Sequence, residues 1–356
     1  MTTVDVLIVG QGIAGTLLAH ELTQRGQRLV VIDEARPNAS TTCAGMVNPV
    51  VLKRFSPVWQ GEAQIHCARQ TLATLAEKLA VELDFPFDIL RIFHDEQERT
   101  TWQNKAELPA LTGLLDKQTY PSPSPVIHAP HGVGKVHLGG RVDVVALLKA
   151  YRQHLQTRRA LFNAPFDYAA LQPVAAGWQY GDITASQVVF CEGYGIKNNP
   201  YFKTLPLNGN KGEVLIVRIP ELKLTAAIKS AVFIMPLPTH GDDVYFVGAT
   251  YHWTEKDNQP TAAGKAQLLE KLQKMLSESA FQSLEVLAHH AGMRPTVSDR
   301  RPLLGRHPEH SNLLVFNGLG TRGVMLGATM AKHLAALMVD GTPLPAEVDI
   351  ARFASA

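Results

Sequence analysis

The first 33 residues place a glycine-rich turn between a predicted strand and a predicted helix. Residues 4–9 are short, apolar and β-branched, which is typical of a buried strand. Residues 10–15 fit the pattern G-x-G-x-x-G, and residues 13–25 carry apolar side chains at helical spacing. Residues 28–32 predict a second strand, which ends at Asp33. Strand, turn, helix and strand within about 30 residues make up a βαβ unit, so this segment predicts a Rossmann-type dinucleotide-binding fold.

Each glycine of this turn has a distinct expected role. Gly10 permits the tight turn, Gly12 lets the backbone approach a diphosphate, and Gly15 lets the helix pack closely on the strand. Ile13 and Ala14 open the helix, whose N-terminus offers unbonded N–H groups and the positive end of the helix dipole to phosphates. We therefore expect residues 10–15 to hold a diphosphate.

An acidic residue follows the second predicted strand. Asp33 is expected to accept hydrogen bonds from ribose hydroxyls, and Glu34 is the alternative acid for that role. The glycine pattern with an acid at this spacing does not by itself distinguish NAD from FAD.

Two further loops favour a flavin. Residues 40–46 are small or carry hydroxyls, and we expect them to approach phosphates and a flat ring, although their composition also fits an ordinary Ser/Thr-rich loop. The residues of this loop assigned to the cofactor are Thr41, Thr42, Ala44, Gly45 and Met46.

The second of these loops, residues 317–323, precedes a predicted helix near the end of the chain. Backbone N–H groups at such a helix start stabilise the negative charge that reduced flavin carries near N1 and O2, although the loop also fits an ordinary strand–helix turn. The residues assigned to the cofactor here are Gly318, Gly320, Thr321, Arg322, Gly323 and Val324, together with Gly193 after the predicted strand at 187–191.

Composition restricts the class of protein. The 356 residues exceed the size at which one core keeps growing, so two domains are expected. The net charge is +2 and no long Lys/Arg run occurs, so a nucleic-acid partner has no compositional support. Three distant cysteines (Cys43, Cys67 and Cys191) predict neither a disulfide framework nor a metal site. We find no run of 18 apolar residues and no signal peptide, and we therefore expect a cytoplasmic protein without a transmembrane segment.

These motifs together resemble the D-amino-acid oxidase superfamily, especially its glycine oxidase and sarcosine oxidase branch. The matching stretches follow the family's order and span nearly the whole chain. They are residues 6–15 with Asp33, then 41–46, 140–143, 211–213, 248–250, 291–295, 302–305 and 318–323. Residues 318–323 also resemble the FAD domain of the bacterial enzyme that completes a methylaminomethyl group on tRNA wobble uridine.

The resemblance implies an α/β fold with two parts. A Rossmann-type FAD domain is assembled from discontinuous segments, residues 1–60, 130–200 and 292–356. An α+β substrate domain, residues 61–129 and 201–291, places an antiparallel sheet over the flavin. Some relatives attach flavin through a cysteine near the C-terminus, which the C-terminal loop lacks, and Cys43 does not match a linkage position. We therefore expect FAD to bind non-covalently.

The resemblance also implies oxidation of a primary or secondary amine, such as a small amino acid or N-alkyl amino acid, to an imine. The hydride passes to flavin N5, and the electrons then pass to oxygen or a quinone-linked acceptor. By resemblance Arg294 binds a substrate carboxylate, whereas a structural salt bridge is the alternative. Arg322 and Tyr251 are placed near the substrate, with a surface or phosphate role and core packing as their respective alternatives.

Two other functions stay open from the sequence. One is oxidation of a carboxymethylamino group on modified tRNA, which requires a basic docking surface or a methyltransferase partner. The other is a flavin-binding module without catalytic activity.

Overall fold

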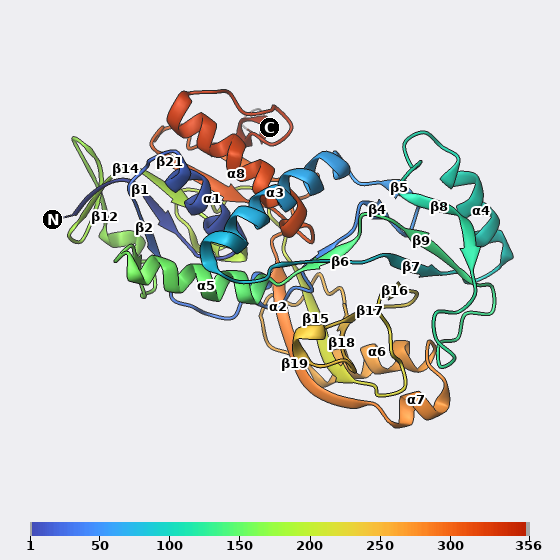
Figure 1. Ribbon diagram of the computed structural model, residues 1–356. Helices are drawn as coiled ribbons and strands as arrows, with labels where there is room; N and C mark the ends of the chain where they lie inside the picture. Colours follow the sequence, from blue (N-terminus) through green and yellow to red (C-terminus); the bar gives the residue numbers. More distant parts are fainter. Residues whose placement is uncertain (1, 354–356) are drawn as a thin grey trace.

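The computed structural model describes residues 2–353 and contains two large sheets (Figure 1). The first sheet has the order β11-β2-β1-β14-β13-β12, with β21 beside β14 and β20 beside β21. Its strands are β1 (Thr2–Val9), β2 (Leu29–Ile32), β11 (Leu161–Phe162), β12 (Leu171–Val174), β13 (Gly177–Tyr180), β14 (Ile183–Phe190), β20 (Leu303–Arg306) and β21 (Leu313–Asn317). The strands β11, β2, β1, β14 and β21 run parallel.

Helices cover one face of this sheet. They are α1 (Ile13–Gln24), α3 (Gly61–Leu79), α5 (Val144–Thr157) and α8 (Gly323–Asp340). Alternate residues of β1 point to opposite faces, so Val6 and Ile8 join the core under the helices while Leu7 and Val9 join the core on the other face. A near-continuous apolar strand is what a parallel sheet covered on both faces requires, and the predicted strand and helix at residues 4–9 and 13–25 are confirmed.

The second sheet is mostly antiparallel and has the order β19-β15-β18-β17-β16-β7-β9-β8, with one parallel pair, β16 and β7. Its strands are β7 (Ile89–Ile92), β8 (Leu115–Tyr120), β9 (Val133–Val136), β15 (Asn210–Arg218), β16 (Ala227–Lys229), β17 (Phe233–Pro236), β18 (Val244–Gly248) and β19 (Glu285–Arg294). Helices α6 (Ala262–Gln273) and α7 (Glu278–Gln282) cover one face, and α4 (Glu96–Ala106) packs on the other.

Short elements join the two sheets. A three-stranded sheet has the order β3-β10-β6, formed by Met46–Val47, Gly140–Val142 and Asp84–Pro86, and β4 (Val50–Val51) pairs with β5 (Ser56–Pro57). The remaining helices are α2 (Ala39–Thr42) and the 3₁₀ turns η1 (Tyr168–Ala170), η2 (Gly193–Asn198), η3 (Pro238–His240) and η4 (Ile350–Phe353). Within residues 2–353, no helix is long and apolar enough to span a bilayer.

The packing refines the proposed division of the chain. Helix α3 places Ile65, Leu72 and Leu75 in the same core as α1 and α8, although residues 61–79 were expected in the substrate domain. Conversely, β9 pairs with β7 and β8 in the second sheet. We therefore propose that α3 belongs with the dinucleotide-binding part and β9 with the substrate part.

Candidate functional site

A cavity of about 760 Å³ is lined by residues from both large sheets. Its walls include the glycine turn after β1, the loop around α2, the start of η2, the end of β19 and the start of α8. Its volume lies within the usual range for small-molecule and cofactor sites. Residues far apart in the sequence thus form one site.

The glycine turn lacks space for side chains. A Cβ on Gly10, whose φ is +98°, would lie 2.7 Å from the Cys191 carbonyl oxygen, and a Cβ on Gly15 would lie 1.9 Å from the Gly10 carbonyl oxygen. Gly12 lines the cavity, where a Cβ would meet Ser40 Oγ at 3.1 Å. Gly15 does not line the cavity, so its role is close packing of α1 on the turn.

Helix α1 begins after Gly12, which is its N-cap residue and has no side chain to cap the helix. Its first N–H groups have no partner within the helix, and Ile13 N–H donates to Ser40 Oγ at 3.1 Å. Ile13 and Ala14 both line the cavity. The backbone here fits a diphosphate, and Ser40 is a neighbour that the glycine pattern did not predict.

Both candidate acids line the cavity, but their surroundings differ. Asp33 accepts from Gln11 N–H at 2.9 Å, from Ala35 N–H at 2.8 Å and from Arg152 Nη1 at 2.7 Å. Glu34 instead forms an ion pair, at 2.8 Å, with the exposed Arg36. Since the protein already uses both oxygens of Asp33, Glu34 retains more capacity to accept from a ribose.

The loop at residues 38–46 divides into structural and cavity-facing positions. Thr41 forms a capping box with Asn38 at the start of α2 and does not line the cavity, because its hydroxyl is used to close the turn. Thr42 lines the cavity while its hydroxyl donates to the Ala291 carbonyl at 3.2 Å. Ala44, Gly45 and Met46 also line it, as does Cys43.

The C-terminal glycine loop reaches the same cavity. Gly320, Thr321, Arg322, Gly323 and Val324 line it. Gly318 does not, because its φ of +73° and a Cβ position 2.7 Å from Val297 Cγ2 make it a tight structural turn. Gly193 lines the cavity too, and its carbonyl accepts from Asn317 Nδ2 at 2.9 Å. Arg322 is the N-cap of α8 but makes no capping hydrogen bond with its side chain.

Arg294 lies at the end of β19 and presents a half-buried guanidinium to the cavity. Its Nη1 donates to Asn210 Oδ1 at 2.7 Å and to the Thr250 carbonyl at 3.3 Å, and the group lies 4.5 Å from the centre of the Tyr251 ring. Burial lowers the pKa of Arg294. No carboxylate in residues 2–353 lies within ion-pair distance of it. Tyr251 is 60% exposed, which is unlike a core residue.

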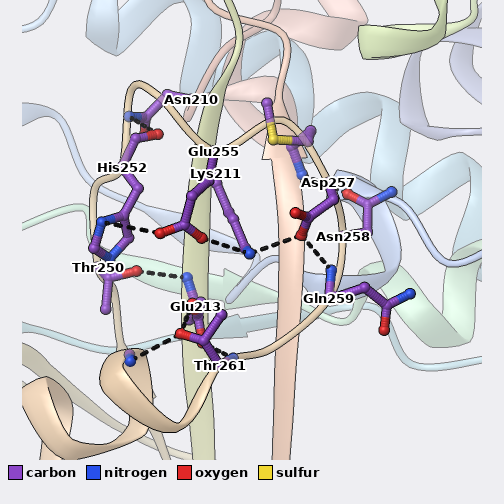
Figure 2. A network of polar contacts seen from close by, with 12 residues as sticks. Asn210, Lys211, Glu213, Thr250, His252, Glu255, Asp257, Asn258, Gln259 and Thr261 are labelled. Carbon is purple, nitrogen blue, oxygen red and sulfur yellow. Dashed lines mark hydrogen bonds and ion pairs between the residues drawn. The ribbon is translucent and has the colours of Figure 1, made fainter.

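The loop that carries Tyr251 is held by a polar network (Figure 2). The buried Lys211 contacts Glu255 Oε2 and Asp257 Oδ1, each at 2.7 Å. Glu213, also buried, accepts from Thr261 N–H and its hydroxyl, both at 2.8 Å. These contacts fix residues 251–261 against β15.

Comparisons with known proteins agree with this geometry. The family model described as "DAO: FAD dependent oxidoreductase" matches residues 5–337. The chain is 26% identical to the tRNA 5-methylaminomethyl-2-thiouridine biosynthesis bifunctional protein MnmC of Aeromonas hydrophila, over 97% of this chain but only 57% of that protein's length. It is 22% identical to glycine oxidase of Bacillus licheniformis, over 96% of this chain and 95% of that one.

A solved structure shares the fold. The crystal structure of glycine oxidase from Geobacillus kaustophilus superposes with a TM-score of 0.79 at 22% identity, covering 97% of each chain. The match to the family model extends over most of the chain and includes both glycine loops of the cavity. This chain therefore belongs to the DAO family of FAD-dependent oxidoreductases.

Proposed function

We propose that this enzyme oxidises a small amino acid or N-alkyl amino acid to the corresponding imine. The observation that carries the proposal is Arg294, whose guanidinium faces the cavity without a carboxylate partner in residues 2–353. A planar guanidinium pairs with a carboxylate through two parallel hydrogen bonds. An amino acid held by its carboxylate in this way has its amine and Cα at a fixed position in the cavity.

The residues at the glycine turn after β1 and at the start of α8 fit FAD. Gly12 and the start of α1 suit the diphosphate, and Asp33 or Glu34 suits a ribose. The N-terminus of α8 suits negative charge at the redox ring. Bound non-covalently, FAD supplies the acceptor for the hydride that leaves the substrate carbon. The protein's role is to hold both molecules in place.

The charge around Arg294 also favours the reactive form of the substrate. Arg294 and Arg322 both line the cavity. A positive charge near an amine lowers the pKa of that amine, since it disfavours the ammonium form. The neutral amine has the lone pair that supports the developing C=N bond, so the site binds the carboxylate and promotes loss of the amine proton together.

Anaerobic mixing with a panel of amines tests this function. Glycine, sarcosine and alanine are expected to bleach the flavin absorbance, and reoxidation by oxygen or by a quinone then identifies the acceptor. The panel includes tRNA with a carboxymethylaminomethyl group, because MnmC is a relative. Bleaching only by that tRNA, or by no amine, contradicts the proposal.

A variant at Arg294 locates the carboxylate site. Arg294→Met is expected to raise KM by roughly 10- to 100-fold, because charge-assisted hydrogen bonds are lost, while the flavin spectrum stays intact. Arg294→Lys is the control, which keeps the charge but loses the two-pronged geometry and recovers part of the affinity. Loss of FAD from Arg294→Met, or an unchanged KM, refutes the assignment.

A further inference from the structure

The carboxylates that line the cavity are all engaged by residues of the chain. Each carboxylate either forms an ion pair or accepts hydrogen bonds from neutral side chains. The pairs are Asp33 with Arg152, Glu34 with Arg36, Asp257 with Lys211, and Glu192 with Asn199 and Tyr168. Burial raises the pKa of Glu192. No carboxylate is left to neutralise other groups of the cavity.

The cations of the cavity are in excess. Besides Arg36, the lining contains Lys256, Arg294 and Arg322. None of these three forms an ion pair within residues 2–353. Lys256 donates instead to two backbone carbonyls, at 2.8 and 3.0 Å, and Arg294 donates to an amide and a carbonyl. The site thus carries positive charge that the described chain leaves unbalanced.

Two of these cations, Arg294 and Arg322, line the cavity together with the phenol of Tyr251. The guanidinium of Arg294 lies 4.5 Å from the centre of the Tyr251 ring. Burial lowers the pKa of Arg322, and the neighbouring Arg300 and Arg301 lower it further by repulsion. A half-buried guanidinium among like charges is costly unless an anion joins it.

A diphosphate bound at the start of α1 does not account for the positive charge of Arg294. Its charge is met at the start of α1, where Gly12 and Ile13 supply backbone groups, whereas Arg294 projects from the second sheet. An ordinary amino acid supplies one carboxylate, which one guanidinium binds through both of its oxygens. Arg322 is a second guanidinium in the same cavity that forms no ion pair within residues 2–353, and a second anionic group of the substrate would pair with it.

We propose that the substrate is an amine with two anionic groups, such as an N-carboxyalkyl amino acid, with one carboxylate on Arg294 and the other on Arg322. This proposal takes the location of the substrate from the proposed function, and it adds the number of negative charges that the substrate carries. It makes Arg322 the residue that distinguishes dianionic from monoanionic amines.

The test uses two ligands that differ by one carboxylate and cannot be oxidised as amines. Methoxyacetate and diglycolate are ether analogues of sarcosine and iminodiacetate, and binding to the FAD-loaded enzyme is followed by the flavin spectrum. Diglycolate is expected to bind at least about tenfold more tightly than methoxyacetate, since a second charge-assisted pair forms. Arg322→Met is expected to remove this preference, because it weakens the binding of diglycolate at least about tenfold more than that of methoxyacetate. Arg294→Met, the control, weakens both ligands.

Each result decides the proposal. It is overturned if the wild type does not prefer diglycolate, if Arg322→Met weakens both ligands equally, or if that variant loses FAD, which assigns Arg322 to the cofactor. Arg322→Gln repeats the test if the Met variant does not fold. Oxidation of sarcosine and iminodiacetate is measured separately. A diglycolate preference without oxidation of either amine refutes the proposed function and leaves the dianion site standing.

Discussion

Gly212 sets the position of the Arg294 guanidinium, and replacing it with alanine tests this directly. An ideal Cβ at Gly212 would lie 1.9 Å from Nη2, 2.1 Å from Cζ and 2.3 Å from Nη1 of Arg294. Ordinary van der Waals contact requires at least 3.4 Å, so the guanidinium must retreat by about 1.5 Å. The obstructing atoms are the far end of a flexible side chain, and we therefore expect the strand to stay in place.

The size of the effect follows from what this displacement breaks. Hydrogen bonds to charged groups contribute about 1.5–3 kcal/mol, and a paired guanidinium and carboxylate depend on alignment. Gly212→Ala is therefore expected to raise the Kd of methoxyacetate by roughly 10- to 150-fold. The flavin spectrum and the Tm are expected to stay close to those of the wild type.

A double-mutant cycle shows whether the effect passes through Arg294. Gly212→Ala, Arg294→Met and the double variant are titrated with methoxyacetate under the same conditions. Once the guanidinium is absent, the alanine has nothing to displace, so it adds no further loss in the Arg294→Met background. An equal loss in both backgrounds, or an unchanged Kd for Gly212→Ala alone, refutes the reasoning.

Three further predictions concern the cofactor site and stability. Gly15→Ala places a Cβ against the backbone carbonyl of Gly10, so we expect a lower Tm and a weaker Kd for FAD in a fluorescence titration, and native values of both contradict this. Glu34→Gln is expected to raise the Kd of FAD about tenfold at an unchanged Tm, whereas Asp33→Asn is expected to lower the Tm. A larger rise of the Kd in Asp33→Asn than in Glu34→Gln assigns the ribose to Asp33. Burial lowers the pKa of His20 from 6.5 to about 4 in the folded protein. The folded protein therefore holds His20 neutral at pH values where the unfolded chain protonates it, and the resulting contribution to the free energy of unfolding is complete above pH 6.5. That contribution, up to about 3 kcal/mol, is lost as the pH falls from 6.5 toward 4. The free energy of unfolding in urea is thus expected to fall less over this range in His20→Leu, and parallel pH profiles contradict it.

Local sequence signals predicted the elements around the first glycine turn. The apolar run at residues 4–9 forms β1, and the helix expected at 13–25 forms α1 with nearly the same bounds. The strand expected at 187–191 lies in the second half of β14 (Ile183–Phe190). In each case the apolar periodicity agrees with what tertiary packing requires, so local information was sufficient.

Contacts between distant residues were not predictable in this way. In strand β19, the first six residues, 285–290, are exposed or half-buried and include His289 and His290. The sequence of β19 therefore has no clear strand pattern. Its strand conformation comes from pairing with β15. Likewise Arg152 contacts Asp33 from 119 positions away, and no local motif marks it. Only the fold brings such pairs together.

The alternation of side chains along β15 explains how one strand serves both stability and ligand binding. Lys211 and Glu213 point to one face, where they hold the 251–261 loop by buried ionic and hydrogen-bonded contacts. Gly212 lies between them and is directed to the opposite face, against Arg294. A side chain at position 212 would overlap with the Arg294 guanidinium. A shift of one residue in register would put a lysine or glutamate against Arg294 and leave the loop without its anchor. The pairing of β15 with β19 therefore fixes both the proposed carboxylate site at Arg294 and the 251–261 loop.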